Sequence, residues 1–328
     1  MTAPARRYGM TIPFDGVPLA EHKEWFRELV DLGYTDVWSA EANGADGFTP
    51  LALAAAWAPE LRLGSAIIPA FTRGPACLAQ SVASLADAAP GRVAFGIGTS
   101  SDVIVQRWNG VPFEEPYRQV KDMVTFVREA LTGEKVSGTY GRSEVKGFRL
   151  GVVPAEPPAI LIAALRQGML RLAGRHGDGA IINWLSAQDV RTVVPIVNEA
   201  AAAAGKPQPE VAARIFVAPT TDRDTVMAMG RYAIAAYLTV PVYAAFHEWL
   251  GRGEELAEMS RLWADGDRKG ALEAIPDSLV DELIVHGSPE QCREHIGRYV
   301  ESGVTTPALA ILPFGIDQRQ AIRDLAPR

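Results

Sequence analysis

Several residue types are scarce in this chain of 328 residues, and each scarcity narrows what the protein is expected to do. The two cysteines, Cys77 and Cys292, lie far apart and lack C-x-x-C spacing. Both are therefore expected to be small buried side chains in a reducing compartment. The five histidines include no pair at metal-ligand spacing. We therefore predict no metal site.

Positive charge and long apolar runs are also limited. Lysine and arginine are scattered and the formal charge is −7, which argues against nucleic acid or an anionic membrane as a partner. No apolar stretch is long and charge-free enough to span a bilayer, and the first ten residues lack the apolar core of a signal peptide. We expect a cytoplasmic protein.

Apolar strands and helices alternate along the chain every 25 to 35 residues. This alternation favours an α/β fold, a (β/α)8 TIM barrel. The alternative is a doubly wound sheet, but Tyr8–Pro13 is not followed by the glycine fingerprint that such a sheet carries after its first strand. The predicted strands are 8–12, 36–39, 62–68, 92–97, 159–163, 180–182, 212–217 and 307–312.

We predict a single domain over residues 1–328, because 48% of the residues are hydrophobic and no linker or composition break divides the chain. Residues 134–156 are rich in glycine and are expected to form a hairpin. Residues of about 222–285 have helical patterns and are predicted to form an insertion between strands seven and eight.

The stretch from Pro158 to Trp184 reads as strand, helix and strand with short joints, a βαβ unit. Its first joint, Ala164–Gly168, opens a helix whose first N–H groups lack partners, and such an end binds phosphate readily. Arg166 adds positive charge there. Alone, however, a turn of this kind is more often an ordinary connection with a surface arginine.

In a barrel, chemistry belongs at the C-terminal ends of the strands. These ends have no Ser–His–Asp set, no metal pair and no carboxylate pair of obvious spacing, which is typical of an enzyme whose cofactor performs the chemistry. Each residue also has a simpler role: Glu41 as a loop carboxylate, Trp184 in packing, Thr99–Ser101 as a helix cap. The ends carry Glu41 and Asn43, Ser65 to Ile68, Thr99 to Asp102, Ala163 to Arg166, Asn183 and Trp184, and Pro313 and Phe314.

Six stretches together resemble the luciferase-like monooxygenase superfamily, and within it the coenzyme F420-dependent oxidoreductases of actinobacteria. The resemblance implies a TIM-like barrel, usually dimeric, that binds F420 or FMN at its C-terminal mouth. It also implies a non-proline cis peptide at the end of strand three, here Ala66–Ile67. The six stretches are Leu32–Ala55, Leu61–Pro75, Gly91–Val103, Trp108–Pro116, Ile160–Leu185 and His286–Val304.

The resemblance also assigns residues to the cofactor. Ser65, Ala66 and Ile67 would lie against its ring, and Thr99, Ser100 and Ser101 by its tail. The phosphate turn would comprise Ala163, Ala164, Leu165, Arg166, Gly168 and Met169. Asn183 would meet the ring or its side chain, with Trp184 beside it. Arg73 and Arg166 are the basic candidates for the phosphate and oligoglutamate tail.

The chain departs from the sugar-phosphate dehydrogenases of the superfamily. Glu41-Ala42 and Ser100-Ser101 stand where those enzymes have their catalytic histidine and glutamate. We therefore expect an F420-dependent oxidoreductase that reduces an activated double bond of a small organic substrate, with a proton from Glu41, Asp102 or water. The alternatives are an FMN-dependent monooxygenase supplied by a partner reductase, and a non-catalytic cofactor-binding barrel. A homodimer is expected.

Overall fold

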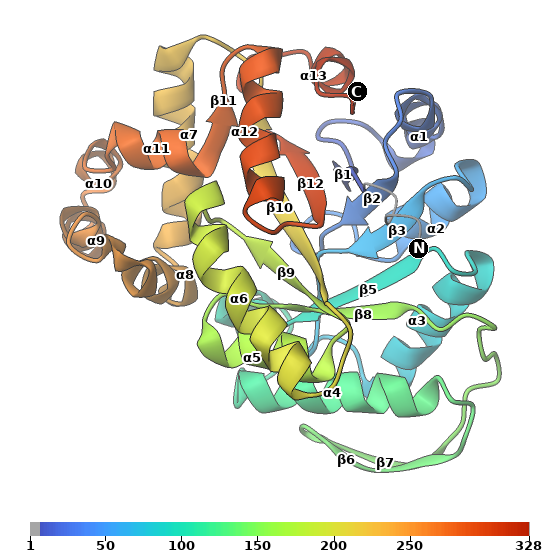
Figure 1. Cartoon of the computed structure of the whole chain (residues 1–328). Coiled ribbons are helices and arrows are strands. Elements are labelled where there is room, and N and C mark those ends of the chain that lie inside the picture. Colours follow the sequence, from blue (N-terminus) through green and yellow to red (C-terminus); the bar gives the residue numbers. More distant parts are fainter. Residues whose placement is uncertain (1–6, 328) are drawn as a thin grey trace.

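Eight parallel strands close into a barrel in the computed structural model of this protein, which describes residues 7–327 (Figure 1). The ring closes because β12 pairs with both β10 and β1. This confirms the predicted (β/α)8 barrel and excludes the open doubly wound sheet. The ring consists of β1 (Gly9–Ile12), β2 (Asp36–Ser39), β3 (Arg62–Ser65), β5 (Val93–Gly98), β8 (Ala159–Ala163), β9 (Gly179–Asn183), β10 (Glu210–Ala218) and β12 (Thr306–Ile311).

The strand side chains alternate between two separate clusters. Met10 and Val37 point outward and belong to the main core between barrel and helices. The inner cluster consists of Trp38, Ala94, Leu161, Ile181, Ala212 and Ala308. Trp38 extends across the barrel over Gly64, where an added Cβ would lie 2.2 Å from the indole ring. Glycine at this position is therefore what lets the tryptophan fill the barrel.

Helices cover the outside of the barrel and bury one face each. In α1, for example, Phe26 and Leu29 are buried, and the helix ends before Gly33, whose φ is +87°. The helix after residue 288 begins with the predicted cap, because Ser288 and Gln291 exchange side-chain-to-backbone hydrogen bonds. The outer helices are α1 (His22–Asp31), α2 (Thr49–Trp57), α3 (Pro75–Ala88), α4 (Pro116–Ala130), α5 (Gln167–His176), α6 (Ala187–Ala203), α12 (Pro289–Glu301) and α13 (Gln318–Asp324).

The glycine-rich segment forms the predicted hairpin, which lies against α4 (Figure 1). Its antiparallel strands are β6 (Val136–Tyr140) and β7 (Ser143–Phe148). Phe126 of α4 contacts Tyr140 and Phe148, with ring centroids 4.9 and 5.7 Å apart. The hairpin therefore adds an aromatic contact outside the barrel and leaves the ring of strands uninterrupted.

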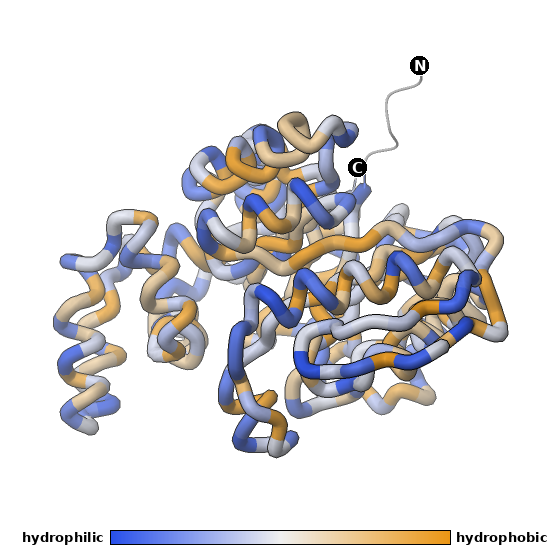
Figure 2. The backbone as a smooth tube through the Cα atoms, turned by 90° about the horizontal axis from the view of Figure 1, so that it is seen from below, coloured by the Kyte–Doolittle hydropathy of each residue, from blue (hydrophilic) through white to orange (hydrophobic). Residues whose placement is uncertain are grey.

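The insertion between β10 and β12 lies on one side of the barrel (Figures 1 and 2). The prediction of helices as far as Val285 is wrong at its end, because Ile284–His286 form the strand β11, which pairs with Phe216–Ala218. Short buried apolar runs do not distinguish a strand from the end of a helix. The helical part consists of α7 (Arg223–Leu238), α8 (Pro241–His247), a π-helical turn (Glu248–Arg252), α9 (Ala257–Ala264), α10 (Arg268–Glu273) and α11 (Asp277–Leu283).

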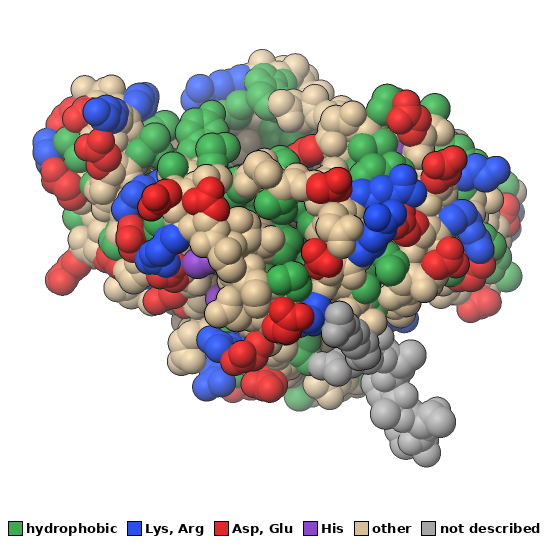
Figure 3. Space-filling view, turned by 90° about the horizontal axis from the view of Figure 1, so that it is seen from above, with side chains coloured by type: hydrophobic (Ala, Val, Ile, Leu, Met, Phe, Trp, Pro, Cys, Tyr) green, Lys and Arg blue, Asp and Glu red, His purple; other side chains and the backbone are tan. Residues whose placement is uncertain are grey.

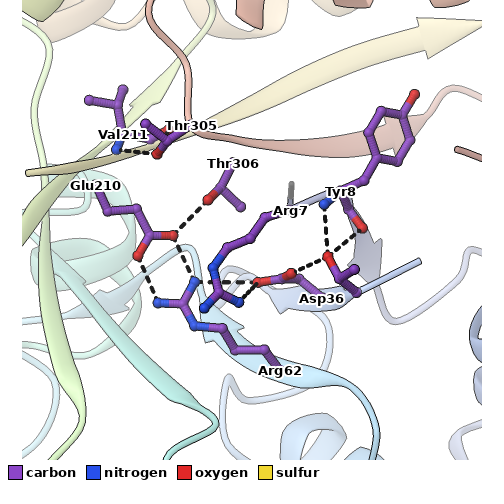
Figure 4. Close-up of polar contacts among 9 residues, drawn as sticks. Arg7, Tyr8, Asp36, Arg62, Glu210, Val211, Thr305 and Thr306 are labelled. Atoms are coloured by element: carbon purple, nitrogen blue, oxygen red, sulfur yellow. Dashed lines mark hydrogen bonds and ion pairs between the residues drawn. The ribbon is translucent and has the colours of Figure 1, made fainter. Parts of the chain in front are cut away.

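A network of ion pairs closes the N-terminal end of the barrel (Figure 4). Arg62 of β3 donates two hydrogen bonds of 2.7 Å to Glu210 of β10 and lies 3.3 Å from Asp36. Arg7 lies 3.4 Å from Asp36, and Thr306 donates to Glu210 at 2.7 Å. Burial raises the pKa of Asp36 in spite of the two arginines, whereas hydrogen bonds and charge from Arg62 outweigh burial and lower the pKa of Glu210.

Charges of both signs are interspersed over the face seen in Figure 3, without a broad area of one sign. None of the helices in residues 7–327 is long and apolar enough to cross a membrane. Within the same residues, no group of three or more His, Cys, Asp and Glu side chains is placed to hold a metal ion.

Candidate active site

The ends of β3, β5 and β8 form a wall of small residues. The Ala66–Ile67 peptide bond is cis, as the resemblance implied, and the short strand β4 (Ile68–Pro69) follows it. Ala66, Ile67 and Ala163 pack against the inner cluster of the barrel. An added Cβ on Gly98 would lie 2.8 Å from the Cβ of Ala163 and 3.2 Å from Ile67. These residues thus lie together, in a wall that carries few bulky side chains.

Ser65 has a structural contact in this wall. Its Oγ donates to the carbonyl oxygen of Gly96 at 3.0 Å and accepts the N–H of the same residue at 2.8 Å. The hydroxyl therefore ties β3 to β5. The assignment of Ser65 to the cofactor ring stays a prediction, and its hydroxyl is already hydrogen-bonded within the sheet.

The turn after β5 combines an unusual backbone with a helix cap. Ser100 has a φ of +61°, and Thr99 Oγ1 donates to the carbonyl oxygen of Ser100 at 3.2 Å. Ser101 Oγ accepts the N–H of Ile104 at 3.3 Å, at the start of the π-helix Val103–Trp108. Ser101 thus has the capping contact that the sequence allowed as its simpler role.

The turn after β8 leads into α5 with its N-terminal groups free of a side-chain cap. Arg166 occupies the N-cap position with extended backbone (φ −114°, ψ 169°), and its side chain is exposed. Gly168 is exposed, and Leu165 and Met169 are half-buried. The first N–H groups of a helix point out of its end and attract anions. Because β5 and β8 are neighbours, this turn and Thr99–Ser101 leave the barrel side by side.

Glu41 is bound by Arg73, which had been predicted to bind the tail of the cofactor. Arg73 donates to both carboxylate oxygens, at 2.6 and 2.8 Å, and the N–H of Gly47 donates at 2.8 Å. The side chains of Glu41 and Arg73 are 13% and 19% exposed. All three contacts suit an ionised carboxylate that accepts hydrogen bonds. The roles of Glu41 as proton donor and of Arg73 at the cofactor tail stay predictions, and this ion pair opposes both.

Asn183 is the last residue of β9, Trp184 follows it, and both contact a cluster of aromatic side chains. Trp184 is 2% exposed and has a φ of +52°. Its ring stacks on Phe216 at a centroid distance of 4.0 Å and lies 4.6 Å from Tyr237. Asn183 Nδ2 donates to Tyr243 Oη at 3.3 Å, while its Oδ1 is buried without a hydrogen-bond partner among residues 7–327. The amide oxygen of Asn183 is therefore a candidate contact for a ligand.

The insertion also contacts the backbone of Trp184, through His247. His247 Nε2 lies 2.9 Å from the carbonyl oxygen of Trp184. A carbonyl oxygen only accepts, so this ring nitrogen carries the proton. Burial, helped by the charge of Arg252, lowers the pKa of His247 to about 4, so the imidazole is neutral near pH 7.

Sequence reasoning missed the residues that the insertion and β10 contribute. Tyr237 of α7, Tyr243 of α8, and Arg214 and Phe216 of β10 are not among the residues predicted for the site. The alternation of inward-facing and outward-facing residues along β10 was the signal that could have identified Arg214. Ala212 belongs to the inner cluster and Val211 and Ala213 to the outer core, so residue 214 faces the interior.

The fold and the site together are those of a barrel enzyme. Its mouth has a wall of mostly small residues, against which a flat ring fits, and few proton-transfer groups of its own. The chain belongs to the luciferase-like monooxygenase family, which matches residues 3–306.

Similar proteins span nearly the whole chain. It is 26% identical to 5,10-methylenetetrahydromethanopterin reductase of Methanolobus tindarius, over 95% of both chains. It is 28% identical to F420-dependent glucose-6-phosphate dehydrogenase of Nocardia farcinica, over 92% of this chain and 94% of the relative. Among solved structures, an F420-dependent secondary alcohol dehydrogenase in complex with an F420–acetone adduct has a TM-score of 0.78 at 18% identity. That match covers 98% of this chain and 99% of the other.

Proposed function

We propose that this protein is an F420-dependent oxidoreductase that transfers hydride between C5 of the deazaflavin and a small organic substrate, in the direction of reducing an activated double bond. The observation that carries the proposal is the small-residue wall of Ala66, Ile67, Gly98 and Ala163, since it leaves one side of the mouth free of bulky side chains for a flat ring. The name of the relative from Nocardia farcinica supports F420 as the cofactor.

The residues at the mouth fit such a group. The unpartnered Oδ1 of Asn183 is an acceptor for a ring N–H, and the uncapped N-terminus of α5 with Arg166 suits a phosphate. When bound, the cofactor would supply the hydride. Asn183 would orient the ring, while Arg166 and the N–H groups of α5 would hold the tail.

The contacts of Glu41 and Asp102, the two acids predicted as proton donors, favour a reduction that takes its proton from water. Glu41 accepts from Arg73 and Gly47, and Asp102 lies 3.3 Å from Arg107. Oxidation of an alcohol would require a base positioned at the substrate hydroxyl. Reduction of an activated double bond asks the protein mainly to position the cofactor and exclude competing reactions.

Cofactor affinity tests the proposal directly. We would titrate the purified protein with F420 and, separately, with FMN, and follow the fluorescence of each. Sub-micromolar binding of F420 with much weaker binding of FMN is expected. Reduced F420 should then be oxidised in the presence of at least one compound from a panel of enones and imines.

Two alternatives correspond to other outcomes. Tighter binding of FMN than of F420 would support a monooxygenase supplied with reduced flavin by a partner reductase. Tight binding of F420 without turnover of any enone, imine or alcohol would support a non-catalytic cofactor-binding barrel. The expected homodimer stays a prediction, which sedimentation of the purified protein would test.

A further inference from the structure

Arg214 is a charged side chain inside the barrel for which residues 7–327 supply no counter-charge. It lies on β10 at the inward-facing parity, paired in register with Asn183 of β9 and Ala308 of β12. Its side chain makes no hydrogen bond or ion pair with residues 7–327, and its Nε is buried. Its guanidinium lies 4.9 Å from the ring centroid of Phe216.

Glu41 and Asp189, two acidic groups that follow the C-terminal ends of strands, are already bound by other cations. Glu41 is bound by Arg73, and Asp189 is bound by Arg252 at 2.9 and 3.1 Å. The polar neighbour of Arg214 on the adjoining strand is Asn183, whose Nδ2 is used by Tyr243. Arg214 as a whole is half-buried, but its Nε–H is removed from water without an acceptor. This costs free energy that a fixed anionic ligand would recover.

The position of Arg214 indicates whether such an anionic ligand belongs to the cofactor or to the substrate. In the ring of eight strands, β3 and β10 are separated by three strands in either direction, so they face each other across the barrel. The cis peptide Ala66–Ile67 follows β3, and the tail turns follow β5 and β8. A cofactor ring placed on the β3 side would leave Arg214 on the opposite side, where a substrate would stack on the ring.

We propose that Arg214 binds a carboxylate of the substrate, so that this barrel acts on small unsaturated organic acids. The inference rests on the proposed function, and it names the substrate class of that same site. The planar fork of Nε–H and Nη–H matches the two oxygens of a carboxylate. Phe216 holds the guanidinium plane in place through cation–π contact.

Acid and amide pairs of one carbon skeleton provide the test. Crotonate and crotonamide, and cinnamate and cinnamamide, would be titrated calorimetrically into the F420-loaded wild type and into Arg214→Gln, Arg214→Lys and Arg175→Gln. Arg175 is the matched control because it is an exposed arginine near the end of α5 that forms no ion pair with residues 7–327. The affinity of each variant for F420 is measured first.

The wild type is expected to bind at least one acid about tenfold or more tightly than its amide. Arg214→Gln should abolish this preference, Arg214→Lys should retain part of it, and Arg175→Gln should leave it unchanged. The proposal is overturned if the wild type shows no preference for either acid, including the case in which none of the four compounds binds. It is also overturned if Arg214→Gln keeps the preference.

Two further readings separate this proposal from the one on which it rests. If Arg214→Gln weakens F420 binding while the acid preference is absent, Arg214 serves the cofactor and the substrate assignment is wrong. If the wild type fails to bind F420, the proposed function is wrong. The acid and amide titrations on the ligand-free protein then still decide whether Arg214 holds a carboxylate.

Discussion

Arg62 and Arg214 both extend into the barrel, one near each end, and their surroundings are opposite. Arg62 is 9% exposed and is bound by Glu210 and Asp36, with Thr306 donating to the same glutamate. Arg214 is bound by no acid among residues 7–327, and its Nε is buried without an acceptor. The charges at the N-terminal end are thus paired within the protein. At the mouth, Arg214 is unpaired among residues 7–327 and is available to a ligand.

This difference indicates that the N-terminal end of the barrel serves stability and the C-terminal end serves function. A compensated ion network gains nothing from a ligand and loses much when one partner is removed. An uncompensated group gains free energy when a ligand of the right chemistry binds it. In TIM barrels the C-terminal face is where chemistry is expected, and the unpartnered atoms of Asn183 and Arg214 lie there.

The largest expected effect is at the compensated end. Arg62→Met should lower the free energy of unfolding by about 3–5 kcal/mol, because Glu210 and Asp36 are left buried without their cation. Urea unfolding followed by circular dichroism measures this. The control is Arg27→Met, which breaks an exposed pair with Glu60 and should cost less than about 1 kcal/mol. Equal losses in the two variants would contradict the contrast between the ends of the barrel.

The second effect concerns the histidine that supports the mouth. His247 has a pKa of about 4 in the folded protein, below its ordinary value of about 6.5, so the unfolded chain binds more protons between these values. Stability should therefore fall as the pH drops from about 6.5 towards 4, by up to about 3 kcal/mol from this residue. The charge of Arg252 adds to this lowering of the pKa, and that of Asp189 opposes it.

The variant His247→Gln isolates that contribution. Glutamine keeps an N–H donor for the carbonyl oxygen of Trp184 but does not titrate. The difference in unfolding free energy between wild type and variant should shrink as the pH falls from 7 to 4. A constant difference would show that His247 has the same pKa in the folded protein as in the unfolded chain.

Glu41→Gln is expected to have a smaller effect. The amide keeps the shape but loses the charge-assisted contacts with Arg73, at a cost of about 1–2 kcal/mol in unfolding free energy. Turnover with reduced F420 should change by less than about tenfold, because a carboxylate that accepts three hydrogen bonds is not poised to donate a proton. A loss of a hundredfold or more at unchanged F420 affinity would restore Glu41 as the proton donor.

Much of the barrel could be predicted because its strands are continuous apolar runs between turns. Asp36–Ser39 and Ala159–Ala163 were predicted with the bounds that the structure has. The predicted strand 62–68 is instead two strands, interrupted at Ala66 and Ile67. Hydropathy is continuous across this break, so the pattern of residues alone does not reveal it.

Contacts between distant residues explain what sequence reasoning missed at the site. Glu41 and Arg73 are 32 positions apart, and both were read as separate candidates until their pairing was visible. Before α2, Asp46 accepts the N–H groups of Phe48 and Thr49, and the helix begins at Thr49. Arg214 stands in an apolar strand, yet only closure of the ring shows that no acid reaches it.

The smallest expected effect is at the mouth and has the opposite direction to that of Arg62. Arg214→Met should leave the unfolding free energy of the ligand-free protein within about 1 kcal/mol of wild type or raise it, because no partner is stranded and an unpaired charge is removed from the interior. The same urea experiment measures it, with Arg175→Met as the exposed control. A loss of about 3 kcal/mol or more would mean that Arg214 is compensated within the protein, and the two ends of the barrel would then not differ in kind.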